Sequence, residues 1–215
     1  NLPPSEIWSD VSSANMNFSE IDISINLGLN LISSTEPPDE SWRTITEDIT
    51  RYKNKTGRIV FYHQIDPNSG SDFFKADLQL DNINVDGSIA TWSTNPQYQT
   101  STSSTSYENA TFAGIPDGAN NGRWSRLNTT NTPSSGTGAN RFSNGFVYTE
   151  ASSPAFAGYE FWMRTPVITL SNNPVLSYVL ASKGSAIGTF KVYFELTEPL
   201  FSDITLDSST WTQAA

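Results

Sequence analysis

The 215-residue sequence contains no cysteine, so it can form neither disulfides nor thiolate metal sites. Its fold must therefore be held together by packing and hydrogen bonds. No apolar run approaches the roughly 18 residues that a membrane-spanning helix needs, and we expect no membrane insertion. None of the P-loop, GxGxxG, HExxH or GxSxG motifs occurs, which leaves nucleotide binding and the common hydrolase mechanisms without support.

Charged residues are also scarce, at 16% of the chain, and the acidic ones outnumber the basic ones by twenty-two to twelve. The resulting net charge of −10 opposes binding to a phosphate backbone, so we expect no nucleic-acid partner. A surface rich in Ser, Thr and Asn but poor in charge is typical of extracellular or virion β-proteins rather than of cytosolic enzymes.

Four segments near the C-terminus alternate apolar and polar residues with a period of two, as half-buried antiparallel strands do. Their sequences are GFVYTEAS (145–152), FWMRTPVITL (161–170), PVLSYVLASKG (174–184) and IGTFKVYFEL (187–196). In the last segment Phe190, Val192, Phe194 and Leu196 share one face. Such strands need a second sheet to bury their apolar faces, so the sequence predicts an all-β, two-sheet jelly-roll sandwich.

Residues 1–40 differ from the rest and are predicted to form an N-terminal attachment segment and linker, with residues 41–215 as the jelly-roll domain. Within the attachment segment, residues 19–27 fit either a short helix capped by Ser19 or an alternating strand, and we favour the helix. Pro37 and Pro38 make residues 33–40 the expected linker.

Further strands are predicted at 41–50, 58–65 and 73–87. Leu78 and Leu80 have the opposite parity to Ile83 and Val85, which indicates a bulge or bend near Asp81 and Asn82. Residues 88–144 are poorly periodic and rich in Ser, Thr, Gly and Asn. Long loops in compact domains commonly bind partners, so contacts are expected there.

A resemblance to a known family makes the predicted fold more specific. The segments GRW (122–124) and TPSSGTG (132–138), followed by the four strands above, resemble in order the first half of a MAM-type jelly roll, and residues 41–85 resemble the second half. SWRTIT at 41–46 also reappears as TWTQAA at 210–215. The halves occur in reversed order, which implies a circularly permuted jelly roll or a piece cut from an array of repeats; we favour permutation.

The same combination is similar to structural proteins of marine bacteriophages, over residues 15–30 and 41–211. Animal MAM domains contain cysteines that this chain lacks, so their disulfides and their role in cell adhesion are not implied. The resemblance instead implies a virion component, built from copies of this chain with other virion proteins.

Catalysis has weak candidates. His63 is the single histidine, it has no nucleophile at motif spacing, and we expect a partly buried structural residue. Jelly-roll glycosidases commonly carry E-x-D-x-x-E or E-x-D-x-E, and the sequence from Glu20 and Asp22 lacks the last carboxylate. Glu150 and Glu160 are expected to accept hydrogen bonds from loop amides rather than to act in catalysis.

A structural calcium ion is the cofactor that the sequence allows. Asp77, Asp81, Asn84 and Asp86 concentrate oxygen ligands near the predicted bend, and hard cations bind such ligands. By resemblance to jelly-roll binding modules with a similar LDNI strand, Asp81 would be a ligand. Solvated turn residues explain the same acids equally well.

Among the six tryptophans, Trp124 lies in a Gly- and Asn-rich loop and is the candidate contact residue, for example for a host-surface glycan. Trp42, Trp162 and Trp211 lie in alternating segments and are expected to be core or interface aromatics. We therefore expect a non-enzymatic bacteriophage structural protein of the tail, fibre or capsid decoration, located in the virion. The alternative is an extracellular carbohydrate-binding or adhesion module.

Overall fold

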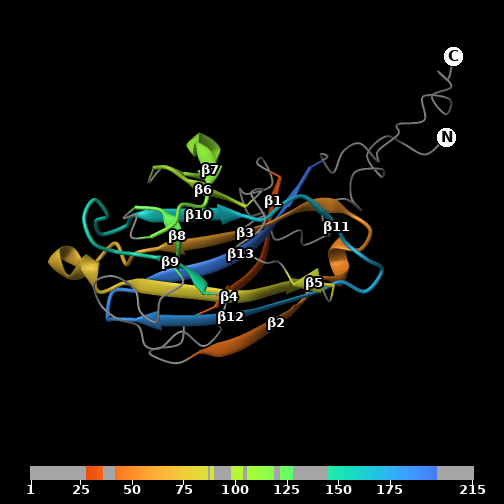
Figure 1. The fold of residues 1–215 in the computed structure, drawn as a ribbon, viewed down its shortest axis with the longest axis horizontal. Coiled ribbons are helices and arrows are strands. Elements are labelled where there is room, and N and C mark those ends of the chain that lie inside the picture. Colours follow the sequence, from red (N-terminus) through yellow and green to blue (C-terminus); the bar gives the residue numbers. More distant parts are fainter. Residues whose placement is uncertain are drawn as a thin grey trace, which may run out of the picture.

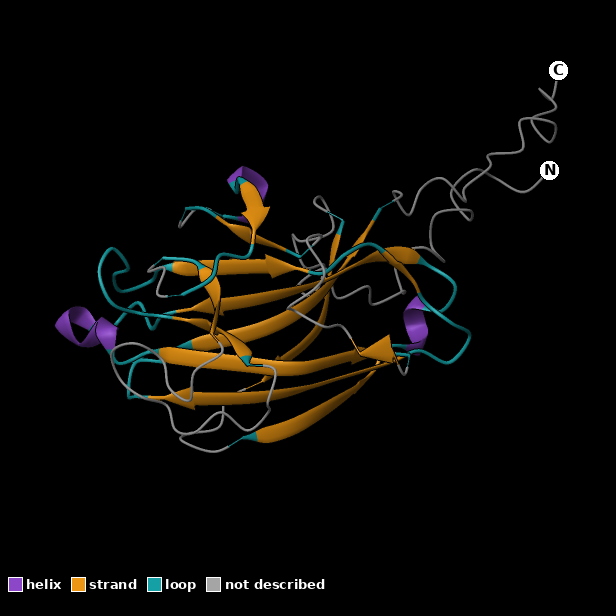
Figure 2. Ribbon diagram, viewed as in Figure 1, coloured by secondary structure: helices purple, strands orange, loops and turns teal. Residues whose placement is uncertain are grey.

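A computed structural model describes residues 28–35, 42–86, 88–89, 98–103, 106–118, 122–127 and 145–197. Over these residues the chain is all-β, with two antiparallel sheets packed face to face (Figures 1 and 2). The described residues contain no α-helix, only the short 3₁₀ helices η3 (Thr50–Tyr52), η4 (Gly70–Phe74) and η5 (Tyr107–Asn109). None of their helices is therefore long enough to cross a membrane. The predicted fold class, an all-β two-sheet sandwich, is confirmed.

The two sheets are named A and B. Sheet A follows the order β1 (Leu29–Thr35), β13 (Thr189–Leu196), β3 (Thr56–Gln64), β10 (Glu160–Arg164), β6 (Gln99–Ser101) and β7 (Phe112–Gly114), and β11 (Ile168–Thr169) also pairs with β3. Sheet B follows the order β2 (Arg43–Asp48), β12 (Val175–Lys183), β4 (Asp77–Val85), β9 (Phe146–Thr149) and β8 (Trp124–Leu127), and β5 (Ser88–Ile89) also pairs with β4.

The two stretches of chain that resemble separate halves of a jelly roll are interleaved in space. β3 comes from the first stretch and lies between β13 and β10 of the second, and β4 lies in the same way between β12 and β9. Each stretch alone would leave its central strands without neighbours. The described strands from β2 to β13 therefore close into one body, while the permuted MAM-like connectivity stays a prediction.

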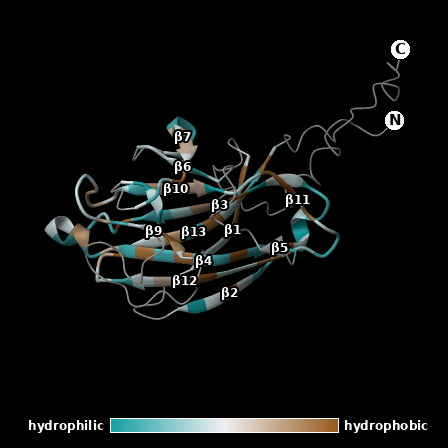
Figure 3. Cartoon of the chain, viewed as in Figure 1, coloured by the Kyte–Doolittle hydropathy of each residue, from teal (hydrophilic) through white to brown (hydrophobic). Residues whose placement is uncertain are grey.

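Alternation within the strands sorts side chains between the two faces as predicted. On β13, Phe190, Val192 and Phe194 are buried in the core between the sheets, whereas Tyr193 packs on the outer face of sheet A. Figure 3 shows the same alternation of hydrophobic and hydrophilic residues along β4. Burial of about 25 cal/mol per Å² of apolar surface is the main stabilising contribution, since no disulfide assists it.

The predicted bend in β4 is confirmed. Asn82 has a positive φ of 47°, and the pairing of β4 with β12 shifts register between Ser177 and Val179. Asparagine tolerates the left-handed region better than most residues, so the extra residue is placed at low cost. The shift explains why Leu78 and Leu80 on one side, and Ile83 and Val85 on the other, all reach the core despite their opposite parity.

Two expectations about organisation are corrected. β1 spans residues 29–35 and pairs with β13, so the sandwich includes part of the predicted attachment segment, and the boundary at residue 40 lies too late. The predicted 88–144 loop contains strands β5 to β8. These strands have two to four residues each and are too short to give a periodic sequence signal. The helix or strand proposed at 19–27 lies outside the described residues.

Candidate functional site

His63 lies on β3 with its ring sealed between the sheets and no exposed surface. Its Nε2 lies 2.8 Å from the carbonyl oxygen of Ile187, and its Nδ1 lies 2.8 Å from the hydroxyl oxygen of Thr149. A carbonyl only accepts, so Nε2 carries the proton and the Thr149 hydroxyl donates to Nδ1. The ring also stacks on Phe161, with centroids 5.4 Å apart.

The imidazole is thus a structural link between β3, β9 and the segment before β13. Burial lowers its pKa to about 4, only partly opposed by the hydrogen bond to Ile187. A neutral ring with both nitrogens engaged and no solvent access has no free lone pair with which to act as a general base. The structural role expected for His63 is confirmed, although the side chain is completely rather than partly buried.

Glu150 and Glu160 take different structural positions. Glu150 follows β9 and is buried, and its Oε1 accepts hydrogen bonds from the Ser152 amide at 3.2 Å and the Ser152 hydroxyl at 2.7 Å. This confirms the expected bond to a loop amide. Glu160 instead accepts from two aromatic side chains, the Tyr62 hydroxyl and the Trp162 indole N–H, both at 3.2 Å. The Glu20 and Asp22 pair lies outside the described residues.

Asp77 and Asp81 are both buried on β4, with exposures of 0% and 3%. The Ala151 amide donates to Asp77 at 3.2 Å, and the Asn82 amide donates to Asp81 at 2.7 Å. Four residues of extended strand separate the two Cα atoms by about 13 Å, whereas calcium ligands lie within about 2.6 Å of the ion. The two carboxylates therefore do not share one cation.

Asp86 lies beyond Val85 in a turn with φ of 55° and holds the β11–β12 connection. Its Oδ2 accepts from the Ser171 amide at 2.8 Å, and its Oδ1 accepts from the Val175 amide at 3.2 Å. Within the described residues, no three His, Cys, Asp or Glu side chains gather closely enough to hold a metal. A joint calcium site of Asp77, Asp81 and Asp86 is therefore not formed, and calcium bound by one of them with other ligands stays a prediction.

Trp124 is part of strand β8, and its side chain is 0% exposed within the main core. Its amide donates to the Thr100 hydroxyl at 3.1 Å, which joins β8 to sheet A. A sugar stacks on an accessible ring face, and a fully buried indole offers none, so the prediction that Trp124 is a contact residue is wrong. The Gly- and Asn-rich sequence around Trp124 predicted a loop, whereas residues 124–127 form a short strand in which Trp124 is buried.

Trp162 confirms its expected role, since it is 7% exposed and packs against Tyr62 with ring centroids 4.2 Å apart. Trp42 is half-buried, with its ring 6.2 Å from that of Phe146 in an edge-on arrangement. Trp211 lies outside the described residues.

An aromatic cluster on the outer face of sheet A was not predicted. Tyr62, Trp162 and Tyr193 form its floor, and Tyr107 of η5 packs edge-on against Trp162 with centroids 5.1 Å apart. η5, which lies between β6 and β7 in the chain, therefore packs over part of the outer face of sheet A. The sequence does contain a signal for a covered outer face, namely the continuous apolar run of residues 59–62. A strand that is buried on both faces loses the alternation of apolar and polar residues.

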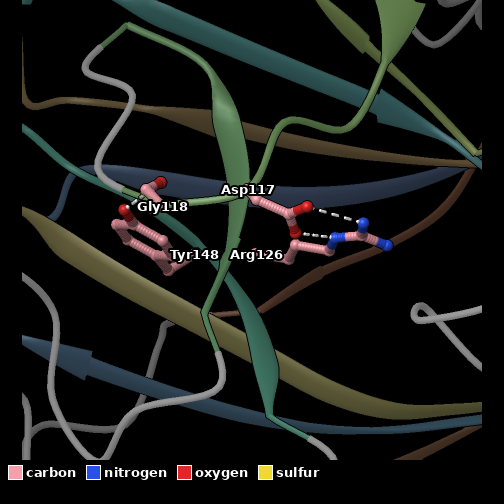
Figure 4. Close-up of polar contacts among 4 residues, drawn as sticks. All are labelled: Asp117, Gly118, Arg126 and Tyr148. Carbon is pink, nitrogen blue, oxygen red and sulfur yellow. Dashed lines mark hydrogen bonds and ion pairs between the residues drawn. The ribbon is translucent and has the colours of Figure 1, made fainter.

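A polar cluster closes the β8 edge of sheet B (Figure 4). The Asp117 and Arg126 side chains form an ion pair in which the Arg126 guanidinium lowers the pKa of Asp117 by hydrogen bonding. Arg126 and the 116–118 segment also exchange two backbone hydrogen bonds of 3.0 Å. The Tyr148 hydroxyl donates to the Gly118 carbonyl at 2.9 Å. This cluster fixes the 116–118 segment beside β8 and has the contacts of a structural element.

Exposed apolar side chains occur at both ends of the sandwich. Phe74 and Phe156 are 48% and 52% exposed, and Val167 and Val175 are 44% and 45% exposed. The alternation in the sequence does not identify them, because Phe74 ends η4, Phe156 and Val167 lie in loops, and Val175 begins β12.

A scan against protein-family models, a search of curated proteins and a search of solved structures each find no match to this chain.

Proposed function

We propose that this protein is a non-enzymatic structural component of a bacteriophage virion, in the tail, a fibre or the capsid decoration, and that it acts through protein–protein contacts. The observation that carries the proposal is the exposure of large apolar side chains at the two opposite ends of the sandwich. Such side chains favour contact with neighbouring proteins over contact with water.

Strand register defines the two ends. Gln64 pairs with Glu160 and Thr189, so the loops 65–76 and 150–159 meet at one end, the Gln64 end. Phe74 and Phe156 lie in these loops. Thr56 pairs with Thr169 at the other end, the Thr56 end, near Val167 and Val175. A module with an apolar contact at each end suits a place between two neighbours along an assembly.

The polar side chains that would have to perform chemistry contribute to the fold instead. His63 is neutral and bonded through both nitrogens, and Glu150 binds the loop that follows it. Both groups lie at the Gln64 end, where they connect loops to strands. Rigid loops favour a contact surface, because less conformational entropy is lost on association.

The resemblance to marine bacteriophage structural proteins is the second support, and it supplies the virion location. On this proposal the sandwich is a permuted MAM-like jelly roll whose partners are other virion proteins and further copies of the chain.

The experiment is immunogold labelling of particles of the phage that encodes the chain, with antibodies against the purified protein. Regular labelling at one position on the particle is expected. In a complementation assay, Phe74→Ser with Phe156→Ser should prevent incorporation while the circular dichroism spectrum stays unchanged. Phe73→Ser is not a matched control because Phe73 packs on the core, so Asn68→Ala, at the same end, is used. Absence from particles together with binding on a glycan array would refute the proposal and favour the adhesion alternative.

A further inference from the structure

Strand β2 forms one edge of sheet B, and among the described strands it pairs with β12 alone. Arg43, Thr44, Thr46 and Asp48 are exposed, while Ile45 is half-buried and packs on the core. Six residues of regular strand therefore present alternate N–H and C=O groups to the outside. An edge of this kind is a template for pairing with another strand.

The other described sheet edges carry devices that oppose such pairing. The β8 edge is covered by the 116–118 segment and the Asp117–Arg126 ion pair. β1 shifts register between Leu31 and Ser33, and the Arg51 side chain donates to the carbonyl of Leu31. The β7 edge is only three residues long. β2 contains neither a bulge nor a proline, and Figure 1 shows it running along the outside of its sheet.

The sequence of β2 is complementary to itself in one antiparallel register. Two copies of β2 can pair in one continuous sheet when a two-fold axis perpendicular to the sheet relates them, because this axis keeps the inner face of both copies on the same side. At such an axis one residue lies directly opposite the same residue of the other copy. With the axis at Ile45, Arg43 of each protomer lies opposite Glu47 of the other, and Thr44 lies opposite Thr46. Two opposite-charge pairs then flank an apolar pair on the inner face.

A register shifted so that the axis passes at Thr46 is less favourable, because it loses the pairing of opposite charges. With the axis at Thr46, Ile45 would lie opposite Glu47, and Thr44 opposite Asp48. Arg43 would lose its opposite charge. Between described residues neither Arg43 nor Glu47 makes an ion pair. The Glu47 carboxylate also interacts with the Tyr178 hydroxyl of the neighbouring strand, and burial together with this carboxylate raises the pKa of Tyr178. Cross-strand pairs of opposite charge stabilise a sheet, and like charges destabilise it.

We propose that two copies of this chain associate through β2, in antiparallel register about Ile45, to form one continuous sheet across a two-fold axis. The net charge of −10 per chain opposes association in general, which makes the local Arg43–Glu47 complementarity the determinant of where the copies meet. The proposal stands on the edge strand alone and does not rest on the proposed function.

A charge-swap experiment tests the pairing. Light scattering of the full chain should give about 47 kDa, twice the 23.6 kDa of one chain, with dissociation on dilution. Arg43→Glu places glutamates opposite each other and should weaken the dimer at least tenfold. Adding Glu47→Arg should restore it. Lys53→Glu, at an exposed turn, changes the net charge equally and should leave the dimer intact.

Cysteine cross-linking tests the register, since the chain has no thiol of its own. Ile45→Cys places two thiols opposite each other at a Cα separation of about 4.5–5.5 Å, which a disulfide spans. Thr46→Cys, although more exposed, places its copies about 8 Å apart and should cross-link poorly.

Three results would overturn the proposal. They are a monomer at all concentrations, an oligomer that Arg43→Glu leaves intact, and a Thr46→Cys disulfide forming faster than the Ile45→Cys one. The Phe74→Ser and Phe156→Ser variant should still dimerise. A dimer that this variant alone abolishes would assign the contact to the Gln64 end and refute pairing through β2.

Discussion

Acidification should destabilise this protein through its single histidine. His63 has a folded-state pKa of about 4 because burial disfavours the charged ring, against an ordinary value of 6.5. The unfolded chain therefore binds a proton as the pH falls through 6.5, whereas the folded chain does not until about pH 4. The free energy of unfolding is at its full value above pH 6.5 and decreases as the pH falls toward 4.

The magnitude follows from the difference between the two pKa values. A difference of 2.5 units corresponds to about 3 kcal/mol in total, of which about 2 kcal/mol is lost between pH 7 and pH 5. That is a large share of the 5–15 kcal/mol typical of a domain. Hydrogen bonds from Thr50 and Arg126 lower the pKa values of Asp48 and Asp117 below the ordinary value of 3.8. The protonation of these two carboxylates therefore changes the stability only at a pH below the interval from 7 to 5.

Urea unfolding at half-unit pH steps from 7 to 5 measures this loss. His63→Gln is the matched variant: it will be less stable at pH 7, but its free energy of unfolding should be nearly flat over the same interval. Thr149→Val removes the donor to Nδ1 and should cost about 1–3 kcal/mol at pH 7, whereas Thr149→Ser keeps the hydroxyl and should cost less.

Nitrogen NMR of the one imidazole gives an independent check. The spectrum should show a proton on Nε2, none on Nδ1, and no titration of the folded ring above pH 5. Two results would refute the reasoning: a folded-state pKa near 6.5, or a pH dependence that is the same in the wild type and His63→Gln.

Three further changes test the backbone and the core. Gly188→Ala should cost about 3 kcal/mol or more in thermal unfolding, because a Cβ would lie 2.2 Å from the Gln64 carbonyl at a φ of +71°, whereas Gly70→Ala, at +55° in open space, should cost about 1 kcal/mol. Asp86→Ala removes the acceptor of two amides and should cost about 1–2 kcal/mol, with Asp86→Asn costing less. Trp124→Ala should cost about 3–5 kcal/mol, and wild-type tryptophan fluorescence should not respond to added polysaccharides.

The elements that the sequence predicted well are long strands with one buried face. In β13 the alternation of Phe190, Val192 and Phe194 with Tyr193 assigned each residue to its correct face. In β4 a parity change located the bend at Asn82, because a core strand can change parity only where the backbone inserts a residue. These signals are local, so a single sequence contains them.

The failures concern features that depend on distant chain segments. Trp124 is buried because the Thr100 hydroxyl of β6 binds its amide and sheet A covers its ring, and neither contact is encoded near residue 124. The same holds for Asp77, whose carboxylate meets the Ala151 amide. The sequence shows acidic residues near a bend but not the backbone amides that these carboxylates bind, and calcium binding by one of the acids stays a prediction.

Strand β3 determines which surfaces of the molecule remain for partners. It is central in sheet A and buried on both faces, with Ile59 and Phe61 against sheet B and Val60 and Tyr62 under the aromatic cluster. Because Tyr107 of η5 covers part of that outer face, sheet A is a middle layer there rather than an open platform. Among the described residues, the exposed apolar side chains at the two ends and the β2 edge are the surfaces on which we propose association, so an assembly role would use loops and an edge strand.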